Sequence, residues 1–288
     1  MHQNRHLQRH VLHGALVRLE RSAAKVARCG LRGERSREAP DLPDDRLTVY
    51  LLFSKDTNYC NKQGLTTMES ILVSWSGGKD SALALYEILK NQNYQISALL
   101  TTVTEDYDRI SMHGVRRILL ERQVASLGFP LEKVFISKNA SNEEYESKMG
   151  QVLAKYKDAG ITSVVFGDIF LEDLRKYRED KLATLDMQGI FPIWKRDTQE
   201  LARSLTALGF KAITTCVDTN TLGRQFVGRV IDEQFLSELP PSVDACGENG
   251  EYHSFVYDGP IFKERVSYTL GEIVLRENRF CYCDLIPD

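Results

Sequence analysis

The sequence lacks the cysteine patterns that would mark a disulfide-rich or zinc-binding protein. Its six cysteines include no CxxC pair, so no metal is assigned to them and reduced thiols in a cytoplasmic protein are expected. Long hydrophobic runs are also absent: none approaches the roughly 20 residues needed to cross a bilayer, so no membrane partner is expected. What remains is a globular protein, because 288 residues with 42% hydrophobic content can supply a substantial core.

Negative charge exceeds positive charge beyond the first quarter of the chain. Residues 1–67 hold 12 of the 37 Lys and Arg residues and 7 of the 40 Asp and Glu residues, a formal charge of +5. Residues 68–288 therefore carry −8, and they show no cluster of Lys and Arg with interleaved aromatic residues. A nucleic-acid partner is not expected for such a surface.

Residues 1–67 form a basic, irregular extension. They lack sustained periodicity and contain the polar, proline-bearing segment RGERSREAPDLPDD, which is typical of a linker outside a folded unit. An organellar transit peptide is the alternative, because such peptides are basic and poor in acids. Met68 stands three residues before the first predicted strand, so a third interpretation places the native start there and leaves residues 1–67 outside the native protein.

The segment ILVSWSGGKDSALALYEILK, residues 71–90, predicts a buried strand, a tight turn and a helix. Adjacent glycines let successive backbone N–H groups point into one concavity, and the helix start and a lysine add positive charge. The adjacent glycines also distinguish this turn from the Walker loop, which needs GxxxxGK[ST]. We therefore predict a phosphate-binding loop made of Ser76, Gly77, Gly78, Lys79, Asp80 and Ser81.

Strands and helices alternate after this loop. The pattern predicts strands over 95–103, 133–137, 162–169, 189–194 and 211–217, and helices over 112–128, 142–160 and 198–208. Such alternation predicts an α/β fold with a parallel sheet covered by helices on both faces, with ligands at the carboxyl ends of the strands. The rhythm fades after Trp194. We therefore expect one domain over 69–195 and a smaller C-terminal α+β domain over 196–288.

Three further segments bring polar groups toward the predicted ligand edge. Gly167 and Asp168 end an apolar strand, where a carboxylate gains nothing from the core, so Asp168 is a candidate for contacting magnesium or substrate. Its alternative is a helix N-cap. His113 is either a substrate contact or a satisfied ring near a helix start. The segment CGENGEYHSF, residues 246–255, is dense in polar residues and either forms a structural turn or builds a site.

These motifs carry a resemblance to known enzymes. SGGKDS resembles the pyrophosphate-binding loop of the ATP pyrophosphatases, or PP-loop superfamily, which split ATP between the α and β phosphates. SGGKDS, FGDIFLEDLRKYR, GRVID and CGENGEYHSF in this order resemble the diphthine–ammonia ligase family, from about Ser70 to the C-terminus. The resemblance implies an adenine nucleotide alpha hydrolase-like fold, of the HUP type. The short, single-module form resembles the bacterial branch of the family.

The resemblance implies an ATP-dependent ligase. A carboxylate is adenylated, pyrophosphate leaves, and ammonia taken free from solution attacks the acyl-adenylate to form an amide and AMP. ATP and Mg²⁺ are the implied cofactors, with Asp80 and Asp168 as metal ligands, and Gly167 beside the nucleotide. Lys79 would neutralise phosphate charge. Glu248, Glu251 and His253 would position the acid or the ammonia, and Glu251 is the expected base.

Several alternatives stay open at this point. The family substrate is the diphthine side chain of translation elongation factor 2, but a bacterial member could amidate another carboxylate, small or protein-borne. A tRNA-modifying PP-loop enzyme is a second reading, although the charge of residues 68–288 does not favour it. A nucleotide-binding sensor without turnover is a third. The sequence does not decide the oligomeric state, and a homodimer is one option.

Overall fold

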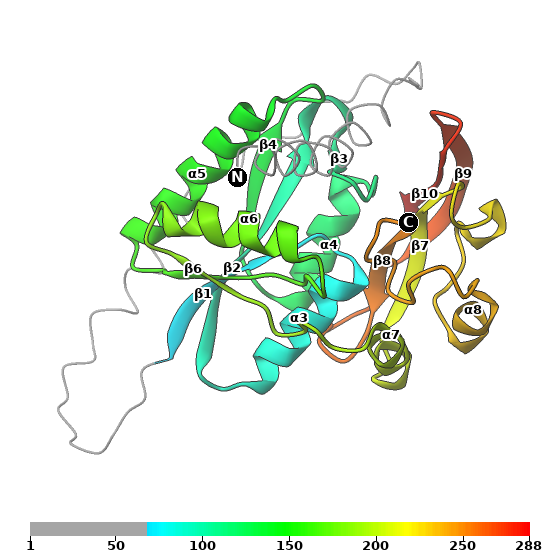
Figure 1. Ribbon diagram of the computed structural model, residues 1–288, viewed down its shortest axis with the longest axis horizontal. Coiled ribbons are helices and arrows are strands. Elements are labelled where there is room, and N and C mark those ends of the chain that lie inside the picture. Colours follow the sequence, from blue (N-terminus) through cyan, green and yellow to red (C-terminus); the bar gives the residue numbers. More distant parts are fainter. Residues whose placement is uncertain (1–67) are drawn as a thin grey trace, which may run out of the picture. The chain divides into compact units, whose positions relative to one another are not determined.

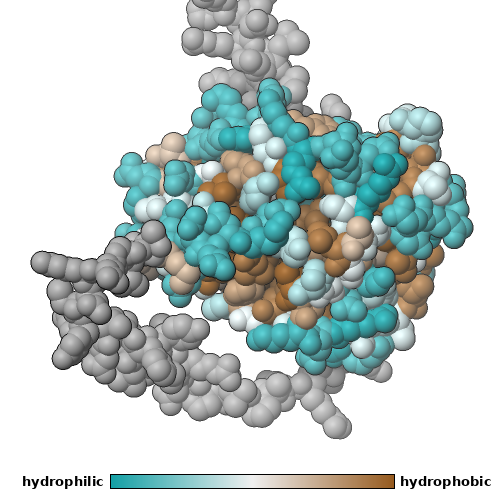
Figure 2. All heavy atoms as spheres, turned by 90° about the horizontal axis from the view of Figure 1, so that it is seen from below, coloured by the Kyte–Doolittle hydropathy of each residue, from teal (hydrophilic) through white to brown (hydrophobic). Residues whose placement is uncertain are grey.

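The structure is a computed structural model that describes residues 68–288 (Figure 1). The three interpretations of residues 1–67 therefore lie outside the described residues. Within residues 68–288, no helix combines the length and the apolar character that crossing a bilayer requires. On the face shown in Figure 2, polar side chains border smaller areas of apolar surface.

The first sheet, sheet A, contains the predicted parallel strands. Five strands pair in parallel in the order β4-β2-β1-β5-β6: β1 (Glu69–Ser74), β2 (Tyr94–Thr104), β4 (Leu131–Ile136), β5 (Ser163–Val165) and β6 (Gln188–Ile190). A sixth strand, β3 (Arg109–Ile110), pairs antiparallel with the end of β2 and was not predicted. The predicted α/β fold with a parallel sheet is confirmed, with this one antiparallel addition.

Helices cover both faces of sheet A. α3 (Lys79–Lys90) and α4 (Arg117–Leu127) pack on the face that carries Ile71 and Val73, while α5 (Asn142–Asp158) and α6 (Glu172–Ala183) pack on the face that carries Leu72. Alternate residues of β1 thus enter two different core clusters, as the period of two along a strand requires. The predicted covering of both sheet faces by helices is confirmed.

The helix ends agree with their local sequence signals, with one exception. The Ser141 hydroxyl accepts from the Glu144 N–H at the start of α5, and Gly128 ends α4 with φ 81°. The exception is the start of α4, which was predicted near Met112. Residues 111–116 instead turn back on β3, and the Ile110 N–H donates to the Val115 carbonyl at 2.8 Å.

The second sheet, sheet B, is antiparallel. Its order is β8-β7-β10-β9, formed by β7 (Lys211–Asp218), β8 (Tyr252–Asp258), β9 (Tyr268–Arg276) and β10 (Phe280–Pro287). Two helices accompany it, α7 (Thr198–Ala207) and α8 (Glu233–Glu238). The sequence predicted β7 and α7 but only an irregular region after them, so β8, β9, β10 and α8 are additions.

Sheet B stands on the side of sheet A that α3 and α4 cover (Figure 1). One core cluster contains buried residues from both sheets, from Ile71 to Leu285. Asp284 of β10 also accepts hydrogen bonds from Arg109 at 2.9 Å and Arg116 at 2.6 Å. Because the core is continuous, the division into domains over 69–195 and 196–288 stays a prediction, although it separates the two sheets.

Candidate functional site

The predicted phosphate-binding loop lies where the strand order of sheet A reverses. β1 and β5 are neighbours, but the chain leaves them toward opposite edges of the sheet, which is the usual place for a ligand in such folds. The loop at 76–81 follows β1, and Gly167 and Asp168 follow β5. Gly167 permits this approach: a Cβ added there would lie 2.8 Å from the backbone of Asp80. The structure therefore brings the two predicted motifs together.

Gly77 and Gly78 shape the loop itself. Gly77 has φ 78°, in the left-handed region that favours glycine, and Gly78 precedes α3 in extended geometry with no side chain capping the helix. The hydroxyl of Ser81 donates to the Gly78 carbonyl at 2.9 Å, and Ser76 accepts from the Gly78 N–H at 3.3 Å. The positive end of α3 thus faces the loop and favours a negative ligand.

Lys79 places a buried positive charge at this helix start. Its side chain is 3% exposed, and Nζ lies 2.8 Å from one carboxylate oxygen of Asp80 and 5.1 Å from the centre of the Tyr252 ring. Burial alone would lower the pKa of Lys79, yet the Asp80 carboxylate and its hydrogen bond hold that pKa above its ordinary value. The ammonium is therefore charged at neutral pH, and Asp80 is its present counter-ion.

Strand β8, from the far end of the chain, closes over the loop. The Val256 N–H donates to the Gly77 carbonyl at 2.9 Å, and the hydroxyl of Ser254 accepts from the Lys79 N–H at 3.2 Å. A third link comes from Gln123 of α4, whose amide donates to the carbonyls of Gly77 at 3.0 Å and Val256 at 2.5 Å. The phosphate-binding loop and sheet B are consequently one hydrogen-bonded unit.

Gln123 is a site residue that the sequence interpretation missed. Its side chain is fully buried, and its amide oxygen accepts from the Trp75 indole at 2.8 Å. The available signal was a glutamine on the apolar face of a predicted helix, where a buried amide needs several partners. Ser254 was noted in the CGENGEYHSF segment, but its contact with the loop was not predicted.

Two histidines lie next to each other near the loop, and His113 is the one beside Gly78. His113 Nδ1 is 3.1 Å from the carbonyl oxygen of Ser254, and the rings of His113 and His253 are 4.9 Å apart. Burial lowers the pKa of His113 to about 4 and that of His253 to about 3. Both rings are neutral at pH 7. Because a carbonyl only accepts, Nδ1 of His113 carries the proton and its Nε2 keeps a free lone pair.

Glu248, in the CGENGEYHSF segment, reaches the rim of sheet A. One of its carboxylate oxygens accepts from the Ile169 N–H at 2.8 Å, directly after Asp168. Burial, aided by the negative charge of Asp80, raises the pKa of Glu248 to about 7, although the Ile169 hydrogen bond and Lys79 oppose the shift. The structure therefore places a carboxyl group that titrates near neutral pH beside the loop.

Glu251 has different surroundings. It is 5% exposed, and its oxygens accept from the Asp244 N–H at 3.1 Å and from the backbone and side-chain amides of Asn249 at 3.0 Å each. These contacts hold the turn at 244–251 in shape. The role of Glu251 as a base is not tested by this geometry and stays a prediction, but its oxygens already serve a structural purpose.

The comparisons with known proteins agree with this arrangement. The model of the diphthamide synthase N-terminal domain matches residues 68–188, and that of the C-terminal domain matches residues 197–285. The human diphthine–ammonia ligase is 30% identical over 222 residues, which cover 69% of this chain and 83% of the human protein. The chain belongs to the diphthine–ammonia ligase family.

Other members of this family differ in length. The zebrafish diphthine–ammonia ligase is 25% identical over 224 residues, covering 70% of this chain and 88% of the relative. The fission yeast enzyme is 24% identical over 229 residues, covering 72% of this chain but 37% of the longer relative. The matched region therefore makes up most of the zebrafish relative but little more than a third of the fission yeast one.

Asp168 and Asp80 are the predicted metal ligands in this member of the diphthine–ammonia ligase family. Asp168 is paired with Arg178, whose Nη2 donates to Oδ1 at 3.2 Å, while its Nε lies 2.7 Å from Oδ2 without the alignment of a hydrogen bond. The helix N-cap alternative for Asp168 is wrong, because α6 is preceded by Leu171 as its cap residue. Among residues 68–288, no group of three or more His, Cys, Asp or Glu side chains is arranged to hold a metal.

The donor set nevertheless fits magnesium. Mg²⁺ in nucleotide sites is usually held by one or two carboxylates together with phosphate oxygens and water, so a third protein ligand is not required. Asp80 and Asp168 follow the adjacent strands β1 and β5, and Oδ2 of Asp168 is buried without a hydrogen-bond partner. Their assignment as ligands remains a prediction.

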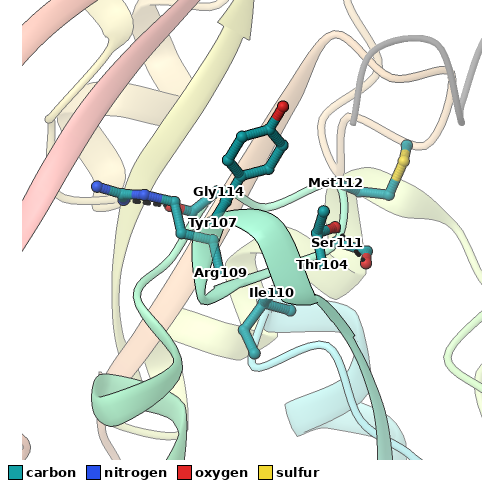
Figure 3. A pocket seen from close by; sticks show the side chains of 7 residues that line it. All are labelled: Thr104, Tyr107, Arg109, Ile110, Ser111, Met112 and Gly114. Atoms are coloured by element: carbon teal, nitrogen blue, oxygen red, sulfur yellow. Dashed lines mark hydrogen bonds between the residues drawn. The ribbon is translucent and has the colours of Figure 1, made fainter. Parts of the chain in front are cut away.

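A cavity of about 150 Å³ opens on the α5/α6 face of sheet A, next to the Asp168–Arg178 pair. It is lined mostly by apolar and aromatic side chains, and Arg178 itself stacks on Phe166 at 4.5 Å. A far smaller cavity, about 10 Å³, lies in the loop after β2 (Figure 3), where the Arg109 and Met112 side chains point to opposite sides. The first can hold a ring, whereas the second has room for about one water molecule.

Proposed function

We propose that this chain is an ATP-dependent, amide-forming ligase that adenylates a carboxylate and transfers ammonia to it. The observation that carries the proposal is the convergence of the glycine loop, the buried Lys79 and Asp168 at the switch point of sheet A. Membership in the diphthine–ammonia ligase family supports the same reaction class. ATP is the expected nucleotide, and ammonia the expected nitrogen donor.

In the first step, a carboxylate oxygen of the substrate attacks the α phosphorus of ATP, and the bond from that phosphorus to the bridging oxygen breaks. The leaving pyrophosphate gains negative charge. Lys79 and the start of α3 lie where they can stabilise that charge, and burial makes each such interaction stronger than in water. When bound, Mg²⁺ would supply further charge neutralisation, held by Asp80 and Asp168.

The ion pair between Lys79 and Asp80 implies a rearrangement on nucleotide binding. Lys79 contacts the carboxylate at 2.8 Å, so it must exchange Asp80 for a phosphate oxygen. Asp80 would then be released toward the metal. The exchange keeps both groups paired with opposite charge, so neither becomes an uncompensated buried charge.

In the second step, the nitrogen of ammonia attacks the acyl carbon, the carbon–oxygen bond to the phosphate breaks, and AMP leaves with the electron pair. One proton must leave the nitrogen. Glu251 was the expected proton acceptor, but Glu248 is better supported. The pKa of Glu248, about 7, suits proton transfer at neutral pH, and its carboxylate contacts Ile169 at the carboxyl end of β5. His253, neutral at pH 7, can orient either reactant.

The cavity beside Asp168 is the proposed place for the nucleoside. Its walls include Leu100 and Phe166, which suit a flat aromatic base, and it begins where β1 and β5 end. The acid would then enter from the side of the Glu248 loop. Diphthine is the substrate that the names of the relatives carry. Diphthine on translation elongation factor 2, or another small or protein-borne carboxylate, is the proposed substrate class here.

The deciding experiment incubates the full chain with ATP, magnesium and ammonium, with and without a cell extract or diphthine-bearing elongation factor, and separates the nucleotides. AMP and pyrophosphate that disappear in Lys79→Ala would support the proposal. Lys90→Ala is the matched control, because Lys90 ends the same helix with a largely exposed side chain. ADP with phosphate would overturn it, and ATP binding without AMP under all conditions would indicate a sensor.

A further inference from the structure

Strand β9 forms an outer edge of sheet B. It is nine residues long and pairs with β10 alone, and the one further backbone hydrogen bond to β9 within the described part of the chain is that of the turn to β10, from the Arg279 N–H to the Arg276 carbonyl at 2.8 Å. An exposed edge of this length is a template for pairing with another strand. Natural proteins blunt such edges with lysine, other charged residues, proline or a β-bulge; β9 contains no lysine or proline, and its own charges and register irregularity lie at Gly271, Glu272 and Arg276.

The side chains of β9 add an apolar surface to this edge. Leu270, Ile273 and Leu275 are 57%, 49% and 37% exposed. They pair with Leu285, Cys283 and Cys281, which are all buried. The three β9 side chains therefore lie on the same face of sheet B as these core residues, but they are exposed. The segment around Gly228 covers this face at β10, because a Cβ added to Gly228 would lie 3.1 Å from the sulfur of Cys283.

The regular part of this edge runs from Ile273 to Arg276, and Glu272 directly precedes it. A register irregularity at Gly271 and Glu272 separates it from the first residues of β9, and Ile273 to Arg276 pair regularly with β10. From Glu272 to Arg276 the order is acid, three apolar residues, base. Neither Glu272 nor Arg276 makes an ion pair within the described residues.

This pattern is complementary to itself in the antiparallel direction. A two-fold axis through Val274 places Ile273 opposite Leu275 of a second copy and Glu272 opposite Arg276 of that copy, twice. Opposite charges in directly facing positions stabilise a sheet pair, and like charges destabilise it. An interface about a two-fold axis must be self-complementary in this way.

We propose that β9 joins two copies of this chain, through antiparallel pairing about Val274, into one continuous eight-stranded sheet. A second copy fits better than a different protein, because the charges satisfy each other only when the partner presents the same five residues reversed. A shift of one residue in the pairing register of the two β9 strands would move Ile273 and Leu275 away from each other and place charged side chains opposite apolar ones. The proposal is independent of the ligase reaction, since β9 contributes nothing to the loop.

Analytical ultracentrifugation of the full chain over a range of concentrations tests it. Wild type is expected to show a monomer–dimer equilibrium. Glu272→Arg alone places arginine against arginine, and Arg276→Glu alone places glutamate against glutamate, so each should weaken the dimer on the order of 10-fold or more at low salt. An equimolar mixture of the two variants should form a heterodimer, and the double exchange should restore the homodimer.

A second pair of variants keeps the test interpretable. Leu275→Lys adds a charge at the apolar contact and should abolish the dimer, whereas Ile118→Lys, an equally exposed site on α4, should not. Unfolding midpoints show whether each variant is folded. A wild-type chain that stays monomeric at all concentrations overturns the proposal. So does a dimer indifferent to both charge variants, because its interface then lies elsewhere.

Discussion

The side-chain amide of Gln123 donates to the carbonyl oxygen of Gly77 at 3.0 Å. The two residues are 46 positions apart, and the bond joins α4 to the turn that holds the proposed pyrophosphate. The same amide group also reaches Val256 of sheet B. A single buried side chain thus ties the nucleotide loop to the part of the fold that carries Glu248 and His253.

Replacing Gln123 should loosen this connection. Gln123→Ala leaves the Trp75 indole without its partner and opens a small cavity, so we expect a loss of about 2–4 kcal/mol in the free energy of unfolding. Urea unfolding measures the loss. Gln151→Ala, at an exposed helix site, is the control and should change stability by less than about 0.5 kcal/mol. Equal losses at both sites would contradict the role of Gln123.

Gly167 is expected to tolerate no side chain. In Gly167→Ala the new Cβ would lie 2.8 Å from the Asp80 backbone, so either β5 or α3 must move, at a cost of about 1–3 kcal/mol. Nucleotide affinity, measured by calorimetry, should fall with it. Gly150→Ala is the matched control for stability alone, because Gly150 lines the cavity proposed for the nucleoside: it lies within α5 with nothing within 4 Å, so alanine should stabilise the helix by up to about 1 kcal/mol. The two substitutions are therefore expected to change the free energy of unfolding in opposite directions.

The reaction rate should depend on pH through Glu248. Its pKa is about 7, and only the deprotonated carboxylate can accept a proton, so the rate of amide formation should rise from pH 6 to pH 8. His113 and His253 stay neutral throughout this range and add no further step. Rate measurements at saturating ammonia provide the profile. A Glu248→Gln enzyme that keeps the same rise would exclude Glu248 as the group responsible.

Glu251→Gln separates a structural role from a catalytic one. The glutamine amide would point a donor at an N–H of Asp244 or Asn249, so the turn should lose about 1–3 kcal/mol of stability. Amide formation is measured at a temperature where the variant remains folded. Activity retained together with lower stability would end the assignment of Glu251 as a base. Activity lost without a stability change would support it and move the proton acceptor away from Glu248.

Much of sheet A could be predicted because its signals are local. The glycine pair, the apolar runs and the cap residues Ser141 and Gly128 act within a few positions of themselves, and they set strand, turn and helix in order. The start of α4 was wrong because residues 111–116 pair with β3, a contact that their own spacing does not encode. The strand β8 was missed because it follows a polar, glycine-rich segment, whereas β9 (YTLGEIVLR) and β10 (FCYCDLIP) carry apolar and aromatic strand signals that the sequence interpretation left unused.

The sequence by itself determined the strand, glycine turn and helix at 71–90, the parallel α/β sheet and the family, because each depends on contiguous residues whose chemistry is readable in place; the binding role of the turn stays a prediction. The tertiary structure decided which distant groups meet there. Gln123 and Ser254 reach the loop from 46 and 175 positions away, and Glu248 touches Ile169 across 79 positions. Such contacts arise from strand order and the joint packing of two sheets, and no local pattern of residues records them.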